Sequence, residues 1–341
     1  MVQVQPKMEP EESIRLPHKP DSPLSYRYVP GQGCFSTSHL LVYLNGLILA
    51  QAGWYETIDR LQLRWAGTNN SNRPALLTYD RYGQARSAPD PADELHGGTH
   101  DIREVVRDLH ALVREVWKAK QQHKKDGAEN EAASPSPPLP KLIFVSNSIG
   151  CVIARLYAEA YPGTVEALLF LDSNIANSDL VSIFPDPDAE GFDPAVLPKG
   201  TTAEDLRHAR AAYKQVFHPS VPNPEHLDRK NIAALVPHSD RPPLRGPQGG
   251  KGPWITVVGH DWDTFAEEGS RGSLHVPKSL TNAFMNPAWA KYNEGLARLT
   301  DEDRARGPII ARSCGHFIQR DNPALVAELT EHLLGRVETG R

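Results

Sequence analysis

The sequence has few cysteines and no long apolar run. Its 341 residues include three cysteines, Cys34, Cys151 and Cys314, an odd number without CxxC spacing, which argues against a disulfide framework and against a zinc site. We interpret Cys151 and Cys314 as small buried packing residues. No segment approaches the roughly 18 continuous apolar residues of a membrane span, and residues 1–15 lack the apolar region of a signal peptide. We therefore expect a cytoplasmic protein with no membrane partner and no metal.

An excess of charge of one sign is also missing. The net charge is -5, and residues of both signs are scattered through the chain, so nothing points to nucleic acid or to an anionic membrane surface as a partner. With 39% hydrophobic and 23% charged residues, the composition suits one large globular α/β domain or a domain with an inserted cap. Nothing in the sequence indicates an oligomeric state.

Short apolar runs alternate with helical periodicities along most of the chain. Buried strands are predicted at residues 40–44, 74–79, 142–145, 165–171, 254–258 and 308–311, and helices at 51–63, 100–118, 283–299 and from Pro323 to before Gly335. Apolar runs separated by helices are typical of a parallel sheet covered on both faces. The predicted fold class is α/β, with a mostly parallel central sheet flanked by helices.

Composition divides the chain into four parts. Residues 1–37 are expected to form an N-terminal arm with a first hairpin, and residues 38–172 and 251–341 the core. Within the core, residues 118–140 are charged and then proline-rich, which predicts an exposed, flexible insertion. Residues 173–250 contain no strand-like apolar run, and helices are expected at 202–217 and 224–236. This pattern predicts a cap over the carboxyl edge of the sheet, where ligands bind.

The stretch LIFVSNSIGCVIAR at residues 142–155 reads as a buried strand, a sharp turn and a helix start. Residues 146–150, SNSIG, match G-x-S-x-G with serine in place of the first glycine, a pattern that sets a nucleophilic serine on a tight bend. Ser148 is therefore the candidate nucleophile, and the Ile149 N–H, at a helix N-terminus, could stabilise an oxyanion. The alternative interpretation is an ordinary serine in a strand-to-helix loop.

A second oxyanion donor is expected from the loop after strand 40–44. Asn45 and Gly46 turn the chain there, and a glycine lets a backbone N–H approach a substrate. The Leu47 N–H is the candidate donor. A plain type I′ or II′ turn is the alternative.

A serine hydroxyl needs a base, and the base needs an orienting carboxylate. His316 follows strand 308–311 in a glycine-histidine step and is the candidate base. Asp261 and Asp263 follow strand 254–258. We favour Asp261 because it comes first off the strand, whereas Asp263 could cap the following helix. The other histidines, His260 included, are interpreted as surface or structural residues.

With these motifs the chain resembles the α/β-hydrolase superfamily, in the branch with a serine nucleophile and a helical cap. The resemblance extends from about residue 38 onward and rests on four stretches: residues 42–47, which look like the HG loop, YDRYGQARS at 79–87, the SNSIG elbow, and GHFIQRDNPALV at 315–326. The chain departs from the family pattern with asparagine at 45 and 147, serine at 146 and cysteine at 151. None of these changes removes a reacting group.

The resemblance also bears on the acid and on the reaction. Family members usually carry the acid two to four residues past a glycine at this strand end, which admits both Asp261 and Asp263 after Gly259. Some members place it after the earlier strand, which makes Asp172 a further alternative. A serine at the nucleophile position does not favour the haloalkane dehalogenase or epoxide hydrolase branches, which use aspartate.

The sequence thus predicts a serine hydrolase that cleaves a small-molecule ester, thioester or lactone through an acyl-enzyme, with no cofactor. Trp54, Phe217 and Trp262 are candidates to line an apolar pocket, with structural packing as the equal alternative for each. One competing hypothesis is other chemistry on the same scaffold, such as a lyase, C–C hydrolase or cyclase. Another is a receptor-like protein that binds its ligand and turns it over slowly.

Overall fold

The computed structural model describes residues 10–67, 72–125 and 138–340. One sheet of eight strands has the order β1-β2-β4-β3-β6-β7-β9-β10. The strands are β1 (Glu12–Leu16), β2 (Lys19–Val29), β3 (His39–Leu44), β4 (Ala75–Tyr79), β6 (Lys141–Asn147), β7 (Val165–Leu171), β9 (Trp254–His260) and β10 (Ala305–Ala311). The pairs β1/β2 and β2/β4 are antiparallel, and the remaining neighbours are parallel. The predicted α/β class with a mostly parallel sheet is confirmed.

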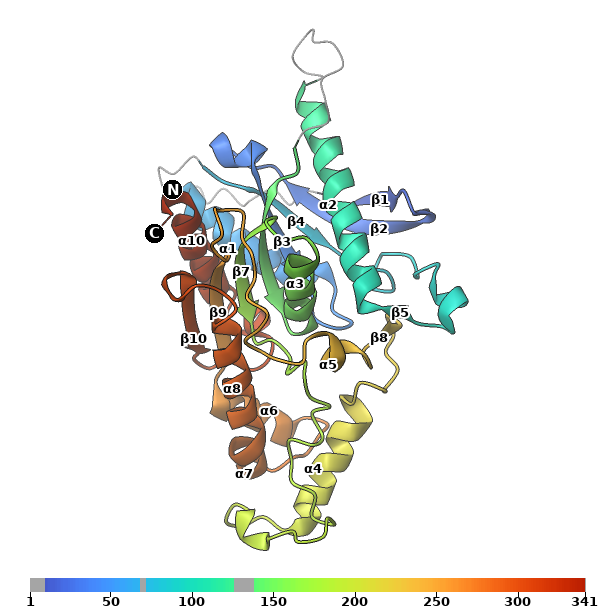
Figure 1. Cartoon of the computed structure of the whole chain (residues 1–341), viewed down its shortest axis with the longest axis vertical. Helices are drawn as coiled ribbons and strands as arrows, with labels where there is room; N and C mark the ends of the chain where they lie inside the picture. The colour runs from blue at the N-terminus through green and yellow to red at the C-terminus, as the bar shows by residue number, and fades with distance from the viewer. Residues whose placement is uncertain (1–9, 68–71, 126–137, 341) are drawn as a thin grey trace.

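Helices cover both faces of the sheet (Figure 1). On one face lie α1 (Tyr55–Ala66) and α10 (Pro323–Thr339), and on the other α2 (Ile102–Lys125), α3 (Ile149–Ala160) and α8 (Asn286–Ala297). Because successive side chains of a strand point to opposite faces, Leu40 and Val42 of β3 pack with the α2 and α3 side, and Leu41 and Tyr43 with the α1 and α10 side. Burial on both faces explains why these strands are apolar throughout.

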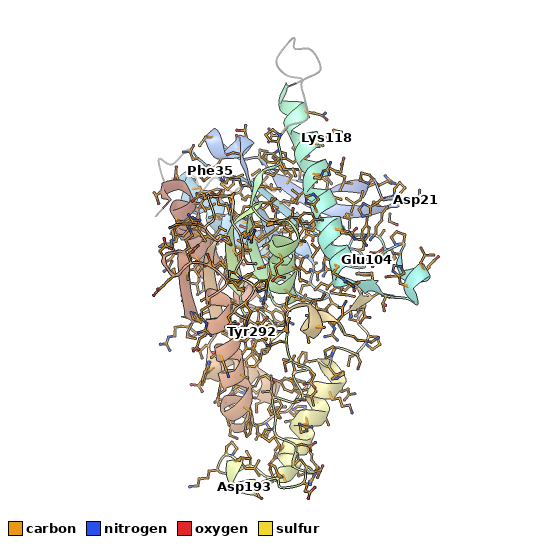
Figure 2. All side chains as sticks on the ribbon, viewed as in Figure 1. Asp21, Phe35, Glu104, Lys118, Asp193 and Tyr292 are labelled. Atoms are coloured by element: carbon orange, nitrogen blue, oxygen red, sulfur yellow. The ribbon has the colours of Figure 1, made fainter. Side chains whose placement is uncertain are left out.

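Two excursions leave the carboxyl edge of the sheet and pack on each other. The first, residues 172–253, contains α4 (Ala203–Val216), β8 (Leu227–Asp228) and α5 (Ile232–Leu235), and the second, residues 261–304, contains α6 (Trp262–Arg271), α7 (Lys278–Leu280) and α8. The ring of His208 lies 2.9 Å from the Leu274 carbonyl oxygen, which joins the two. Figure 2 shows Asp193 at the far tip of this projection and Tyr292 near its junction with the core. The sequence prediction assigns only residues 173–250 to the cap.

The start of the segment predicted as a flexible insertion is helical. Helix α2 continues to Lys125, so the prediction is wrong for residues 118–125, and residues 126–137 lie outside the described part of the chain. Lysine and glutamine are good helix formers, and here they also find partners on the core. The Lys120 ammonium lies 2.6 Å from the Glu12 carboxylate, and the Gln121 side chain donates to the Ser36 carbonyl at 3.1 Å.

The prediction of a helix at residues 224–236 is also wrong. Only α5 is helical there, and β8 instead pairs in parallel with β5 (His100–Asp101), a short strand before α2. Glu225 and Leu227 are almost fully buried, at 1% and 2% exposure, against the core. Contacts with the core therefore override the local helical pattern.

The last helix is longer than predicted. Helix α10 begins as expected, with the Asn322 side chain accepting from the Leu325 N–H at 3.0 Å and Pro323 in the first turn. It passes through Gly335 and ends before Gly340, whose φ of 68° provides a left-handed cap. Among the residues that the structure describes, none of the helices combines the length and apolar character needed to cross a bilayer.

Candidate active site

The bend after β6 has the backbone of a strained strand-to-helix turn. Ser148, between β6 and α3, adopts φ 57° and ψ -126°, a conformation that a residue with a side chain rarely takes. The close approach of strand and helix explains Gly150, since a Cβ there would lie 2.5 Å from the Leu44 carbonyl oxygen. Ser146 is tolerated in place of glycine because its hydroxyl donates to the Leu169 carbonyl at 3.2 Å. Such a turn exposes a serine hydroxyl at the sheet edge.

Asn147 ties this bend to the loop that carries His316. Its fully buried side-chain amide donates to the carbonyl oxygens of Leu171 and His316, both at 2.9 Å, and its oxygen accepts from Gln319 at 3.1 Å. The asparagine that departs from the family pattern at this position therefore joins β7 and the His316 loop to the bend. Only the tertiary contact shows it, because an asparagine before the serine carries no such signal in sequence.

His316 and Asp172 form a hydrogen-bonded pair beside the bend. The His316 Nδ1 lies 2.6 Å from Asp172 Oδ2, with the aspartate completely buried and the histidine side chain 19% exposed. Asp172 directly follows β7, the neighbour of β6 in the sheet, and its φ of 44° is again unusual. Within the described ranges, the His316 Nε2 has no hydrogen-bond partner, so this nitrogen is available to a substrate or to a nearby hydroxyl.

The favoured acid, Asp261, does not contact His316. Its Oδ1 accepts from the N–H groups of Asp263 and Thr264 at 3.1 Å, which caps α6, and Oδ2 accepts from the Ser313 N–H at 3.4 Å. Asp263 lies exposed in the first turn of α6. The sequence-based choice, Asp261, is therefore not the carboxylate that meets His316. The further alternative, Asp172, is, and Asp261 is occupied at the start of α6 and by the Ser313 N–H.

A second histidine holds the other oxygen of this carboxylate. His260 Nδ1 lies 2.9 Å from Asp172 Oδ1, and its Nε2 lies 3.0 Å from the Asn286 side-chain oxygen. Burial alone would raise the pKa of Asp172, but the charges and hydrogen bonds of His260 and His316 outweigh it and hold that pKa below its usual range. The carboxylate is therefore ionised and fixed on both oxygens.

His260 is not a surface residue, since it is only 2% exposed. Its ring stacks on Phe265 with centroids 4.1 Å apart and meets Trp289 edge-on at 5.4 Å. The prediction that His260 is structural or exposed missed its contact with Asp172. The sequence did offer one indication of this contact. His260 lies at the end of a buried strand, as does Asp261, which was singled out for that reason.

The candidate oxyanion loop, residues 45–48, lies against the bend. A Cβ on Gly46 would lie 3.5 Å from Ser148 Cβ, so the backbone passes close to the serine. In the part of the chain that is described, no hydrogen bond engages the Leu47 N–H. The Ile149 N–H belongs to the first turn of α3, where amides lack intrahelical partners. Both candidate donors therefore remain available near Ser148.

The contacts of the three predicted pocket aromatics differ from one another. Trp54 is 1% exposed and donates from its indole to the Asn45 side chain at 2.8 Å. It therefore contacts the oxyanion loop through the first residue of that loop. Phe217 packs on Tyr213 of α4, with ring centroids 5.2 Å apart. Trp262 lines a surface cavity of about 440 Å³ beside β10, whose lining includes neither Ser148 nor His316. The rings next to His316 are instead Trp289, at 5.4 Å, and Phe317, at 5.1 Å.

Two cysteines lie close in sequence to these residues. Cys151 and Cys314 are buried, and burial raises the pKa of the first thiol to about 12 and of the second to about 11, so both stay protonated near neutral pH. Over residues 10–67, 72–125 and 138–340, no group of three or more histidine, cysteine, aspartate or glutamate side chains is arranged to hold a metal ion.

Comparison with known proteins connects this geometry to a family. The profile described as "Alpha/beta hydrolase family" matches residues 41–329. A search of curated protein sequences finds no significant match.

Solved structures resemble the chain over nearly its whole length. A protein described as a probable hydrolytic enzyme from Pseudomonas aeruginosa aligns with a TM-score of 0.51 and 17% identity, covering 96% of this chain and 94% of that one. Mouse alpha/beta hydrolase domain-containing protein 10 aligns with a TM-score of 0.50 and 12% identity, covering 96% and 99%. At these identities the likeness concerns the fold alone.

Proposed function

Because the chain belongs to the alpha/beta hydrolase family, we propose that it is a serine hydrolase. It cleaves a carboxylic ester, thioester or lactone of a small apolar molecule through an acyl-enzyme. The observation that carries the proposal is the strained backbone of Ser148 beside the hydrogen-bonded pair of His316 and Asp172. A hydroxyl, an imidazole and a buried carboxylate are the groups that acyl transfer requires.

In the acylation step, Ser148 Oγ attacks the substrate carbonyl carbon while His316 Nε2 takes the hydroxyl proton. Asp172 accepts from Nδ1–H, fixes the tautomer and stabilises the imidazolium that forms. The N–H groups of Leu47 and Ile149 donate to the oxyanion, and each such donor typically contributes about 2.7 to 4 kcal/mol. The imidazolium then gives its proton to the leaving oxygen or sulfur as that bond breaks.

Deacylation repeats the same steps with water. His316 Nε2 takes a proton from water as its oxygen attacks the acyl carbon, and returns the proton to Ser148 Oγ when the second intermediate collapses. The products are a carboxylic acid and free enzyme. No group outside the protein and its two substrates is needed to balance this sequence.

The surroundings of the reacting groups favour an apolar substrate. The rings of Trp289 and Phe317 flank His316, and Ile48 on the oxyanion loop is 56% exposed with a φ of 56°. A ligand that covers exposed apolar surface, such as that of Ile48, lowers the free energy by about 25 cal/mol per Å² of apolar surface buried. A short aliphatic or aromatic acyl group is therefore the expected substrate class.

The test is covalent labelling with a fluorophosphonate probe, alongside hydrolysis of a short-chain p-nitrophenyl ester. Wild type is compared with Ser148→Ala, His316→Ala and the control Ser146→Ala, which removes a hydroxyl two residues before Ser148. We expect labelling of wild type and the control, no labelling of Ser148→Ala, and ester turnover lowered on the order of 10⁶-fold in Ser148→Ala. A folded wild-type protein that neither labels nor hydrolyses any ester would contradict the proposal.

A further inference from the structure

A buried ion pair joins the first excursion to the candidate oxyanion loop. Glu225, which precedes β8, is 1% exposed, and Arg81, in the loop after β4, is 3% exposed. The Arg81 Nε and Nη2 donate to the two oxygens of Glu225, each at 3.1 Å. Two parallel bonds between a guanidinium and a carboxylate fix both groups in orientation.

Both members of this pair also bind the loop itself. Arg81 donates from Nη1 to the Asn45 carbonyl at 2.7 Å and from Nη2 to the Gly46 carbonyl at 2.9 Å. Glu225 Oε1 accepts from the Ile48 N–H at 3.0 Å. The peptide groups before and after Leu47 are therefore each held by a charged side chain.

These bonds, together with one from the Gln84 side chain to the Gly46 carbonyl at 3.2 Å, set the direction of the Leu47 N–H. In a trans peptide the C=O and the N–H of the same plane point to opposite sides. Since the Gly46 carbonyl points toward Arg81, the Leu47 N–H points away from Arg81. The bond from the Ile48 N–H to Glu225 fixes the next plane, so the loop cannot rotate about Leu47 without breaking a bond to one of these two side chains.

Glu225 is held on the core by its neighbours in sequence. Its Cα lies where a Cβ on Gly83 would approach to 2.8 Å, so the two backbones touch. His226 Nδ1 lies 2.8 Å from the Gly98 carbonyl oxygen, and Leu227 pairs with His100 in the two-stranded sheet. The segment that carries Glu225 is thus docked on the core independently of the oxyanion loop.

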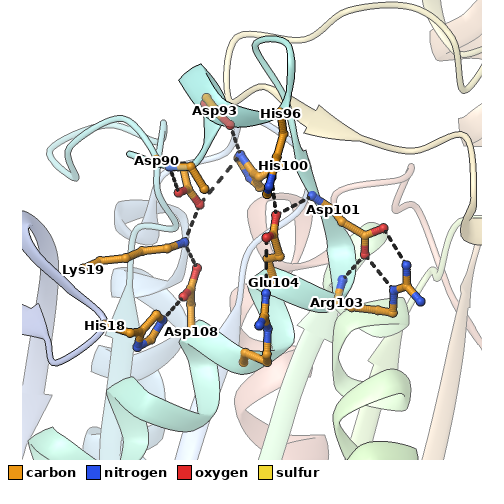
Figure 3. A network of polar contacts seen from close by, with 12 residues as sticks. His18, Lys19, Asp90, Asp93, His96, His100, Asp101, Arg103, Glu104 and Asp108 are labelled. Atoms are coloured by element: carbon orange, nitrogen blue, oxygen red, sulfur yellow. Dashed lines mark hydrogen bonds and ion pairs between the residues drawn. The ribbon is translucent and has the colours of Figure 1, made fainter.

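The core side of this docking surface is a network of ion pairs and hydrogen bonds, shown in Figure 3, whose centre at Lys19, Asp90 and His100 is buried. His100 Nδ1 lies 2.8 Å from Asp93, and the Lys19 ammonium lies 2.6 Å from Asp90 and 2.7 Å from Asp108. Each ionised group in this network has a partner of opposite charge or a histidine, as buried charges require. The segment 225–228, which carries Glu225, therefore packs against side chains that hold one another in place.

From this geometry we propose that Glu225 is a positioning residue for the oxyanion loop, through which the first excursion sets the direction of the Leu47 N–H. The inference rests on the proposed serine-hydrolase function. Glu225 does not touch the reacting atoms, and it acts through Arg81 and the Ile48 N–H.

The experiment compares Glu225→Gln with His226→Ala in hydrolysis of a short-chain p-nitrophenyl ester. Glu225→Gln keeps the size of the side chain but removes the charge that holds Arg81, whereas His226→Ala weakens docking and does not touch the loop. We expect Glu225→Gln to lower kcat about 10- to 100-fold with little change in KM, and His226→Ala to stay within about twofold of wild type in kcat. The pH profile of kcat should keep its shape in both variants, because His316 and Asp172 are unchanged.

A double variant, Glu225→Leu with Arg81→Met, covers the outcome in which Glu225→Gln does not fold. Removing both charges leaves no buried charge unpaired and is often tolerated, yet the loop still loses both restraints, so the same loss of kcat is expected. Equal kcat values for a folded Glu225→Gln protein and wild type, or equal losses in Glu225→Gln and His226→Ala, would overturn the inference.

Hydrogen exchange separates this inference from the proposed function. Exchange at the Ile48 amide, which donates to Glu225, should speed up in Glu225→Gln and not in His226→Ala, whether or not the protein hydrolyses esters. If wild type neither labels nor hydrolyses, the proposed function fails, and the exchange rates still decide whether Glu225 holds the loop. Unchanged exchange in Glu225→Gln would mean that it does not.

Discussion

The two edges of the parallel sheet carry the same kind of pair in different surroundings. At the amino edge, His39 Nε2 lies 2.7 Å from the Glu166 carboxylate, and at the carboxyl edge His316 Nδ1 lies 2.6 Å from Asp172. Both carboxylates are almost completely buried, Glu166 at 1% exposure and Asp172 at 0%. A buried histidine–carboxylate pair therefore does not by itself identify an active site.

The remaining partners distinguish the two edges. At the amino edge, the other ring nitrogen of His39 lies 2.8 Å from the Ser38 hydroxyl, and Glu166 also binds Lys141 at 3.3 Å and Gln248 at 3.2 Å. Every polar group in this cluster therefore has a partner in the protein. At the carboxyl edge, the second nitrogen of His316 has none in the described part of the chain.

Backbone geometry differs in the same way. Three residues around the carboxyl-edge site have positive φ angles, Ile48 at 56°, Ser148 at 57° and Asp172 at 44°, whereas none of the five residues of the amino-edge cluster does. Such conformations cost on the order of 1 to 3 kcal/mol each and collect at functional sites. An unpartnered nitrogen together with a strained backbone is thus the more informative signal.

Replacing the acid should produce the largest difference between the edges. Asp172→Asn keeps the shape of the side chain but stabilises the wrong histidine tautomer, which typically lowers kcat about 10⁴-fold. The matched control is Asp261→Asn, which changes a helix cap and should leave kcat within a few-fold of wild type. Steady-state ester hydrolysis measures both. A larger loss in Asp261→Asn would restore the acid favoured by sequence.

Breaking the pair at the amino edge should affect stability and not catalysis. Glu166→Gln removes the charge that binds His39 and Lys141, and we expect the free energy of unfolding to fall by about 1 to 3 kcal/mol. Because no reacting group lies at this edge, kcat of the folded variant should match wild type. Urea unfolding and ester hydrolysis on the same preparation test this. A loss of kcat in Glu166→Gln at an unchanged free energy of unfolding would contradict the distinction between a structural amino edge and a catalytic carboxyl edge.

His260 should give the smallest effect, visible in the pH dependence of stability. Burial alone would lower the pKa of His260, but the charge of Asp172 and the hydrogen bonds to Asp172 and Asn286 raise it above its ordinary value. A raised folded-state pKa stabilises the protein fully below the unfolded pKa and loses that contribution as pH rises through the folded pKa.

The corresponding experiment compares melting temperatures of wild type and His260→Asn from pH 6 to pH 9. The advantage of wild type should be largest at pH 6 and shrink as the pH rises. A difference that stays constant over this range, or grows with pH, would show that His260 does not gain a proton affinity from Asp172 on folding.

Much of the fold was accessible from sequence because its signals are local. Apolar runs identify the central strands, a small-residue turn identifies the bend at Ser148, and a glycine-histidine step before a capped helix singles out His316. Each of these depends on neighbours within a few residues. The alternation of strands and helices then allows little besides a parallel sheet covered on both faces.

Local patterns misled where long-range contacts compete with them. The helical pattern at residues 224–236 gives way because Glu225 and Leu227 are buried against the core. Helix α2 extends beyond its apolar stripe, where Lys120 contacts Glu12 of β1 and Gln121 contacts the short 3-10 helix Gly33–Thr37. At residues 224–236 the free energy of the tertiary contacts exceeds a local preference of a few tenths of a kcal/mol per residue, whereas at the end of α2 the contacts add to a local preference for helix.

The sequence by itself determined the α/β class, the bend that carries Ser148 and the loop that carries His316. Only the tertiary structure decided which carboxylate meets the histidine, because Asp172 and Asp261 both follow buried strands. In the folded chain the Asp261 carboxylate caps α6, whereas Asp172 lies against His316. The same holds for Glu225, whose charge gains its role from Arg81, 144 residues away in sequence. Strand order and long-range ion pairs depend on how the whole chain packs, which no short stretch of sequence encodes.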